Sequence, residues 1–337
     1  MGLYFVNAAD ELVGEALAGF ARAHAEHIRW DERDGYVQAL EPAPTRRVGL
    51  VSGGGSGHEP LHTGYVGTGM LDAACPGRVF ASPHNRQILA ASRAVAGSDG
   101  VLHVVKNYTG DKINFGIAAE RLAREGIACG RVLVDDDVAT ESDEVATGRR
   151  GTGATVLVEK ILGAAADTGM GLADLVALGT DVAARCRSIA VASAAHTSPA
   201  TGRPAFDLPP GAVEYGVGIH GERARHTLAE RSLRDLAEDM VAALVGSLDL
   251  GPRAQVVLLV NGLGGVTRLE LYAVLGEVTR LLDKRGAATV RTLVGDYVTA
   301  LDMRGFSLTL LAADDATLAY YDAPASAPAW CGRPRAG

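Results

Sequence analysis

Residues 47–65 read RVGLVSGGGSGHEPLHTGY, a short apolar segment that runs into a glycine-rich turn. His58 and Glu59 follow the last glycine of this turn. A nucleotide-binding P-loop would carry a lysine followed by a hydroxyl residue here, and the turn has neither. The glycines predict a close approach of the backbone to a small ligand, and the alternative is a tight strand-to-helix turn without a ligand.

The length and composition predict an ordinary globular protein. The chain has 337 residues, enough for two α/β domains or a single large one, and 47% of them are hydrophobic. Its net charge of -8 argues against nucleic-acid binding, which needs a basic face. No apolar run reaches the roughly 20 residues of a membrane span, and the first residues do not resemble a signal peptide. Four scattered cysteines without metal-ligand spacing favour free thiols, so we expect a cytoplasmic protein.

Hydrophobic periodicity predicts the architecture. Apolar strands at 48–55, 99–111 and 129–139 alternate with helical patterns, the first of which spans most of the first 30 residues. Asn114 is the candidate N-cap of the helix that ends near residue 127. We expect two α/β domains, residues 1–190 and 191–337, with largely parallel or mixed sheets covered by helices.

Polar residues follow two of the predicted strands. KNYTGD, residues 106–111, places Lys106 and Asp111 at the end of the second strand. Such a run is typical of a polar turn, but open α/β sheets also bind ligands at the carboxyl ends of their strands. Asp111 would then be a carboxylate beside His58, suited to act as a general base.

Two further stretches carry candidate groups. GVGIHGE, residues 216–222, surrounds His220 with glycines that leave its imidazole approachable. Asp135, Asp136 and Asp137 could attract Mg²⁺, since Mg²⁺ prefers carboxylates. Consecutive side chains on an extended chain point in alternate directions, which favours an acidic loop at a strand end instead.

Together these motifs resemble the K subunit, or K domain, of dihydroxyacetone kinases. The similarity is carried in order by SGGGSGHEP, GMLDAACPG, KNYTGDKINF, VDDDVA, GRRGTGATVLVEKILGAAA, GVGIHGE, VNGLGG and TALDMRGFSLTLL. It extends from about residue 5 to residue 330, which is essentially the whole chain.

The resemblance implies a phosphotransferase subunit that holds a short ketose, such as dihydroxyacetone, as a covalent hemiaminal on His220. It implies that His58 and Asp111 bracket the acceptor hydroxyl as catalytic residues. The substrate-binding set that it implies is Gly55, Ser56, Gly57, His58, Lys106, Asp111 and His220, with no metal bound by this chain. The neutral imidazole of histidine is a fair nucleophile towards a ketone.

The resemblance also implies partners. In this family a separate L domain or subunit carries Mg-nucleotide, ATP or ADP, so the chain is expected to be a homodimer that is inactive without it. The phosphoryl donor, ATP or a phosphotransferase-system phosphoprotein, stays open.

The sequence departs from the family around GERARH, AAHTSPATGRPAF and SPHNRQI, which leaves a related ketose such as erythrulose open as the substrate. A non-catalytic ketone sensor that acts as a transcriptional coactivator is the alternative role. The presence of both His58 and Asp111 argues against it, because a sensor needs only the covalent histidine.

Overall fold

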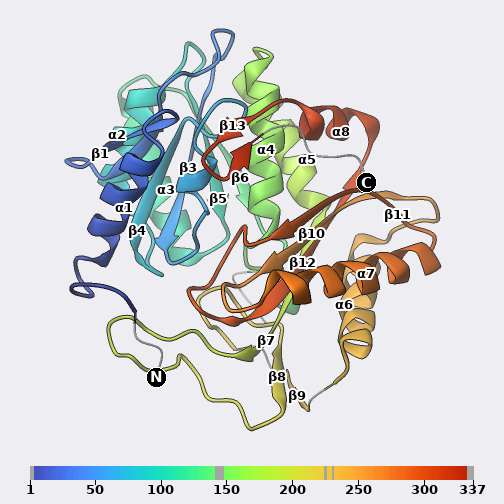
Figure 1. The fold of residues 1–337 in the computed structure, drawn as a ribbon. Coiled ribbons are helices and arrows are strands. Elements are labelled where there is room, and N and C mark those ends of the chain that lie inside the picture. Colours follow the sequence, from blue (N-terminus) through green and yellow to red (C-terminus); the bar gives the residue numbers. More distant parts are fainter. Residues whose placement is uncertain (1–3, 141–147, 224–225, 230, 332–337) are drawn as a thin grey trace.

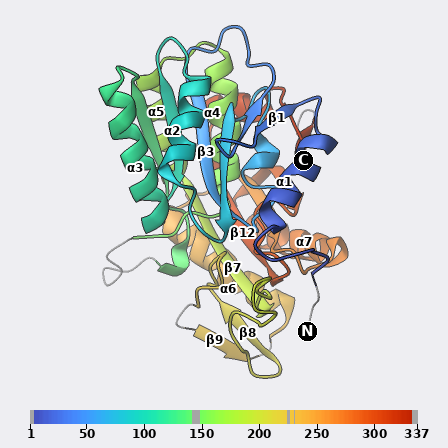
Figure 2. The ribbon, with the colours of Figure 1, turned by 90° about the vertical axis from the view of Figure 1, so that its left-hand side faces the viewer.

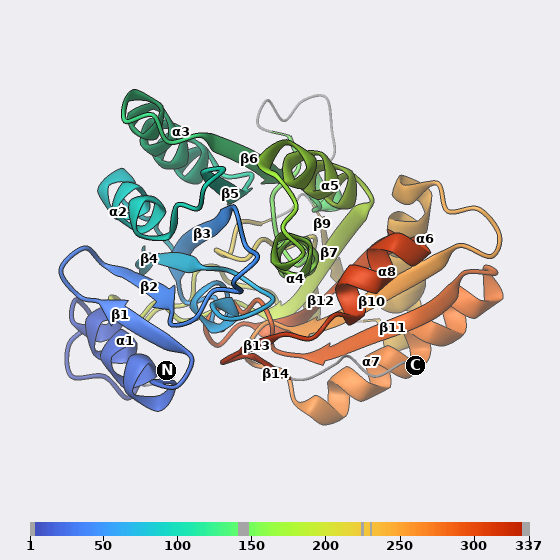
Figure 3. The same cartoon turned by 90° about the horizontal axis from the view of Figure 1, so that it is seen from above.

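The computed structural model describes residues 4–140, 148–223, 226–229 and 231–331. Two six-stranded sheets stack with helices outside and between them, and the view from above in Figure 3 shows these layers edge-on. One pair of helices covers the outer face of each sheet, and a further group lies between the sheets. No helix in these ranges is both long and apolar enough to cross a membrane.

The first sheet is mixed. Its parallel part runs through β4, β3, β5 and β6, and the hairpin of β1 and β2 adds two antiparallel strands at the β4 edge. In spatial order the strands are β1 (Ile28–Asp31), β2 (Tyr36–Ala39), β4 (Ala73–Val79), β3 (Gly49–Ser56), β5 (Val101–Lys106) and β6 (Cys129–Val134). Helix α1 (Leu12–Ala23) packs against β1, in agreement with the predicted N-terminal helix.

Helices cover both faces of this sheet, as Figure 1 shows. Helices α2 (Asn85–Val95) and α3 (Thr109–Arg124) share an apolar cluster with the outer face. Helices α4 (Ala154–Asp167) and α5 (Leu172–Ala184) pack on the inner face, which looks towards the second sheet. Two short 3-10 helices, Thr63–Tyr65 and Val138–Thr140, lie in the connections.

The second sheet is mainly antiparallel, and only its β10–β11 pair is parallel. Its order is β11 (Ala288–Gly295), β10 (Gln255–Gly262), β12 (Arg304–Ala313), β7 (Cys186–Ala194), β8 (Ala212–Tyr215) and β9 (His226–Ala229). Helices α6 (Leu233–Leu248) and α7 (Arg268–Lys284) cover its outer face, and α8 (Asp315–Asp322) contacts α4. Strands β13 (Ser326–Ala327) and β14 (Trp330–Cys331) form a separate hairpin. Figure 2 shows β7, β8 and β9 beneath the first sheet.

The predicted fold class of two α/β units with mixed sheets is confirmed. The predicted boundary at residue 190 lies inside β7, the strand that opens the second sheet. The assignment of Asn114 as an N-cap is wrong, because α3 already begins at Thr109 with Tyr108 at its N-cap. The turn-like composition of KNYTGD belongs to a strand-to-helix junction. Of the cysteines with described side chains, Cys75, Cys129 and Cys186 are free thiols.

Helix α4 is the centre of the molecule. All its residues from Ala154 to Ala166 are buried, because one face packs on the first sheet and the other on the second. Gly163 is required by this packing, since a Cβ there would lie 2.5 Å from the Cα of Met70. An all-round apolar pattern is typical of a helix buried on every side.

A buried carboxylate fixes the start of α4. Asp136 accepts hydrogen bonds from the backbone N–H of Thr152 (2.7 Å) and of Ala154 (3.0 Å), and from the hydroxyl of Ser188 on β7. The Thr152 hydroxyl donates to it as well, at 2.8 Å. One side chain therefore joins the end of β6, the start of α4 and the second sheet.

We expect Asp136→Asn to lower the free energy of unfolding by about 2–3 kcal/mol. The donors that now bind a charged carboxylate would face a neutral amide instead. Asp135→Asn is the matched control. Asp135 is half-buried and pairs with Arg149, so its loss should cost less than about 1 kcal/mol. Chemical denaturation of both variants measures the difference, and equal losses would contradict the role of Asp136.

Candidate functional site

The glycine loop is shaped by its own protein neighbours. β3 ends at Ser56, and the Ser56 hydroxyl donates to the carbonyl of Gly77 at 2.7 Å. A Cβ on Gly55 would lie 2.6 Å from the backbone nitrogen of Ala81. Gly57 has φ +100°, and a Cβ there would lie 2.8 Å from the Phe80 ring. Gly55 is thus required because the backbone of residues 80–81 passes close to it, and Gly57 because of its positive φ and the nearby Phe80 ring.

Two histidines from different sheets meet beyond this loop. His58 follows β3, and His220 lies in the turn after β8. Their ring centroids are 4.8 Å apart. Phe80 stacks on His58 at 4.9 Å, and Tyr108 meets the His220 ring edge-on at 4.7 Å. His58 and His220 therefore lie in one group of aromatic rings that joins the two sheets.

His58 is held as a neutral acceptor. Burial lowers its pKa well below the usual value, and the nearby His220 and Lys106 lower it further. Its Nδ1 lies 2.8 Å from the carbonyl oxygen of Thr299, which can only accept a hydrogen bond. The Nδ1 atom therefore carries the proton, and the Nε2 lone pair is left to accept one.

Lys106 and Asp111 lie side by side at the end of β5. Asp111 is in the first turn of α3, and its Oδ2 is 3.9 Å from the Lys106 Nζ atom. Both side chains are buried. Burial lowers the pKa of Lys106, whereas Asp111 and Glu159 oppose that shift. The structure therefore brings Lys106 and Asp111 together, and the charge of Lys106 contributes to lowering the pKa of His58.

Several buried polar atoms around these rings have no hydrogen-bond partner within the described part of the chain. They are His58 Nε2, Asp111 Oδ1, Tyr108 Oη and His196 Nδ1. His196 meets the Phe80 ring edge-on at 4.7 Å. Most buried polar atoms in proteins are hydrogen-bonded, so a group of unsatisfied ones in a single region indicates a polar ligand.

Glu222 orients His220, a role that the sequence interpretation did not assign. The His220 Nδ1 atom lies 2.9 Å from Oε1 of Glu222, and the backbone N–H of His220 donates to Oε2 at 2.9 Å. Burial alone would raise the pKa of Glu222, but His220 and Arg150 lower it to about 2. The ionised carboxylate accepts a hydrogen bond from the Nδ1–H group, so the lone pair of the neutral imidazole form lies on Nε2. The i, i+2 spacing in HGE was the available signal.

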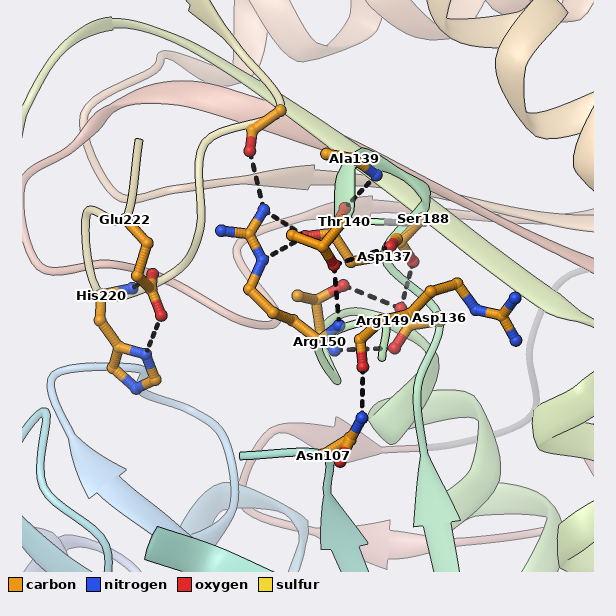
Figure 4. A network of polar contacts seen from close by, with 12 residues as sticks. Asn107, Asp136, Asp137, Ala139, Thr140, Arg149, Arg150, Ser188, His220 and Glu222 are labelled. Atoms are coloured by element: carbon orange, nitrogen blue, oxygen red, sulfur yellow. Dashed lines mark hydrogen bonds and ion pairs between the residues drawn. The ribbon is translucent and has the colours of Figure 1, made fainter. Parts of the chain in front are cut away.

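Arg150 joins the two sheets next to this turn, as Figure 4 shows. Its guanidinium donates to Asp137 at 2.8 Å and to the carbonyl oxygen of Gly216 at 2.8 Å. A Cβ on Gly218 would lie 2.5 Å from Arg150 Nη1 and 2.1 Å from Glu222 Oε2, so these two groups flank that glycine. Arg150 therefore supports the backbone that presents His220.

The acidic run has a structural role in the described ranges. Asp135 pairs with Arg149, Asp136 binds the start of α4 and Asp137 pairs with Arg150. No cluster of three potential metal ligands occurs among the described residues. The interpretation of this run as an acidic loop fits these contacts better than a Mg²⁺ site.

We expect Arg150→Gln to leave Asp137 buried without its ion pair and to destabilise the protein by about 3 kcal/mol. Amide hydrogen exchange in residues 213–223 should become faster, because the tie to Gly216 is lost. Arg185→Gln is the control, since Arg185 bonds the Ala312 carbonyl and lies away from the turn. Unchanged exchange at 213–223 in the Arg150 variant would contradict the supporting role.

Comparisons with known proteins identify the family of the chain. The Dak1 domain model matches residues 18–329. The chain is 40% identical to the "PEP-dependent dihydroxyacetone kinase, dihydroxyacetone-binding subunit DhaK" of Escherichia coli strain K12, over 96% of this chain and 98% of the relative.

Two solved structures are also similar. The dihydroxyacetone kinase of C. freundii superposes with a TM-score of 0.90 and 33% identity, over 99% of this chain and 62% of that one. A dihydroxyacetone kinase operon co-activator gives a TM-score of 0.89 and 32% identity, over 95% of this chain and 98% of that one. The fold, the motifs and these similarities together establish that the chain belongs to the Dak1 family.

Proposed function

We propose that the chain is the substrate-binding subunit of a dihydroxyacetone-type kinase, a phosphotransferase. The observation that carries the proposal is the meeting of His220, whose Nδ1 faces Glu222, with His58, whose Nε2 atom has no partner among the described residues. Asp111 lies beside Lys106, the charge of which contributes to lowering the pKa of His58. This set offers one nucleophile and two proton acceptors. The names of the similar proteins support dihydroxyacetone as the ligand.

Covalent capture follows from the state of His220. Its Nε2 attacks the carbonyl carbon of the ketose, a carbon–nitrogen bond forms, and the π bond of the carbonyl breaks. The carbonyl oxygen gains one proton, and the imidazole loses the Nδ1 proton that faces Glu222, so charge and protons balance. The hemiaminal selects ketones and aldehydes over polyols, which packing alone discriminates poorly. A related short ketose such as erythrulose would be captured in the same way.

Phosphoryl transfer then needs a base at the terminal hydroxyl. Asp111 takes the proton of the terminal hydroxyl as the hydroxyl oxygen attacks the phosphorus. The neutral His58 accepts a hydrogen bond through Nε2 from the part of the ketose next to that hydroxyl. General-base catalysis of this kind contributes roughly 10²–10⁴-fold, and positioning supplies most of the remainder. Gly55, Ser56 and Gly57 form the loop that carries His58. The Lys106 Nζ atom lies 3.9 Å from Asp111.

The phosphoryl group comes, in our proposal, from Mg-nucleotide held by a separate L subunit. The name of the Escherichia coli relative supports a donor recharged by a phosphoenolpyruvate-dependent phosphoprotein. We also propose a homodimer, as in the family, and a cytoplasmic location. The free thiols Cys75, Cys129 and Cys186 fit a reducing compartment.

Similarity to a co-activator structure favours a second candidate, a non-catalytic ketone sensor. The two roles differ in what they require of the site. Capture needs His220 and Glu222, whereas a sensor has no use for a buried carboxylate with an unsatisfied oxygen beside a buried lysine. The arrangement of Asp111 and Lys106 therefore supports the kinase subunit.

The test of capture is His220→Ala. Incubation with dihydroxyacetone followed by native mass spectrometry should show one adduct on the natural chain and none on the variant. Thr197→Ala, a change in the loop after β7 and outside the proposed site residues, should keep the adduct. An adduct of normal occupancy on His220→Ala would assign the nucleophile elsewhere.

Asp111→Asn should separate binding from chemistry. Asparagine preserves the shape of the side chain but is a poor proton acceptor. The hemiaminal forms at the carbonyl carbon, so its formation does not need Asp111. With the nucleotide-bearing partner present, adduct occupancy should stay within about twofold while kcat falls by roughly 10²-fold or more. A variant that turns over at the natural rate would reject Asp111 as the base.

A further inference from the structure

A chain of hydrogen-bonded, buried polar side chains connects Lys106 to helix α4. The Lys106 Nζ atom lies 2.7 Å from His62 Nε2, and His62 Nδ1 lies 2.6 Å from Oε1 of Glu159 on α4. Lys106 and Glu159 are fully buried, and His62 is nearly so. The capture and transfer steps above use neither His62 nor Glu159.

The donors and acceptors of this chain permit two arrangements with equal numbers of protons. In the first, the Lys106 ammonium donates to His62 Nε2, and His62 Nδ1–H donates to the Glu159 carboxylate. In the second, one proton has moved from Lys106 to His62 Nε2 and another from His62 Nδ1 to Glu159. Lys106 is then a neutral amine and Glu159 a neutral acid, and the net charge is unchanged.

The two arrangements are closely balanced because burial acts on both ends. Burial raises the pKa of Glu159 to about 8, although Ser52 and Lys106 oppose it. Burial likewise lowers the pKa of Lys106, against the opposing charges of Asp111 and Glu159. His62 stays uncharged, since burial and Lys106 lower its pKa well below the usual value.

The remaining groups that face this chain are few. The Ser52 hydroxyl lies 3.0 Å from His62 Nδ1 and donates to the Val104 carbonyl at 2.8 Å. His58 contributes to lowering the pKa of His62. The buried Tyr65 phenol lies near Glu159, and burial together with Glu159 raises the pKa of Tyr65. Asp111 is therefore the carboxylate at the Lys106 end of the chain, and Glu159 is the carboxylate at the other end.

We propose that Glu159 and His62 form a proton relay that adjusts the charge of Lys106 when Asp111 changes its charge. The proposal rests on the proposed function. While Asp111 is ionised, it favours the ammonium form of Lys106 beside it. When Asp111 takes the hydroxyl proton, that counter-charge disappears, and the relay passes one proton from Lys106 towards Glu159. No uncompensated buried ammonium remains, so Glu159 and His62 act as positioning residues for phosphoryl transfer.

The lysine content of the chain makes a direct test feasible. Lys106, Lys112, Lys160 and Lys284 are its only lysines, so ¹³C-lysine labelling gives four Cε signals whose titration NMR can follow. Lys106→Met identifies the signal of interest. In Glu159→Gln the Lys106 signal should titrate about one pH unit lower than in the natural chain, because a compensating charge has been removed.

Thr155→Val is the matched control. Thr155 is fully buried one turn earlier on α4, and its hydroxyl has no partner within the described residues. This variant should leave the Lys106 titration unchanged. Glu159→Asp keeps the charge and should restore most of the natural titration. If Glu159→Gln does not fold, Glu159→Met removes the same charge and suits the apolar surroundings of α4.

Turnover with the nucleotide-bearing partner tests the second half of the proposal. Glu159→Gln should lower kcat by roughly tenfold and move the alkaline limb of its pH profile downward, with adduct occupancy within about twofold of the natural chain. A Lys106 titration identical to that of the natural chain would overturn the relay. A shifted titration with unchanged kcat would also overturn it. Failure of the natural chain to bind a ketose covalently would instead reject the proposed function. The NMR titration would still decide whether Glu159 and Lys106 are coupled.

Discussion

Burial of α4 between the two sheets is the constraint on which the rest of the structure depends. Each of its faces packs on a different sheet, so its position fixes the distance between them. Arg150 lies in the segment that leads into the helix and supports the turn of His220, whereas Glu159 lies on the helix and faces His62. The two halves of the candidate site are therefore attached to one rigid element. A shift of α4 would move the nucleophile and the lysine together.

The sequence predicted those parts of the structure that depend on local pattern. The alternation of apolar strands and helices indicated the first sheet, and the glycine turn and KNYTGD marked the ends of β3 and β5. Carboxyl ends of parallel strands lie at one edge of a sheet, so His58 and Asp111 could be expected on the same rim. Placing His220 beside them required the family resemblance, because no local pattern relates the two sheets.

Other parts depended on contacts that no short stretch contains. Glu159 lies in a helix that reads as an ordinary apolar core segment, and only the fold brings it to His62 and Lys106. Phe80 and Tyr108 lacked a signal, because their contacts with the His220 ring cross between the sheets. The mainly antiparallel second sheet was likewise hidden, since strand direction is set by connections and packing rather than by apolar periodicity.

The unsatisfied atoms of the site are the cost of its function. A buried donor or acceptor without a partner destabilises a fold by about 1–3 kcal/mol, and His58, Asp111 and Tyr108 each carry one. These residues are held by neighbouring features of the fold: the Thr299 carbonyl for His58, the start of α3 for Asp111 and the edge-on contact with the His220 ring for Tyr108. A ligand with several hydroxyls would satisfy such atoms on binding. In the proposed function, pairing these atoms on binding makes the candidate site selective for a small polar molecule.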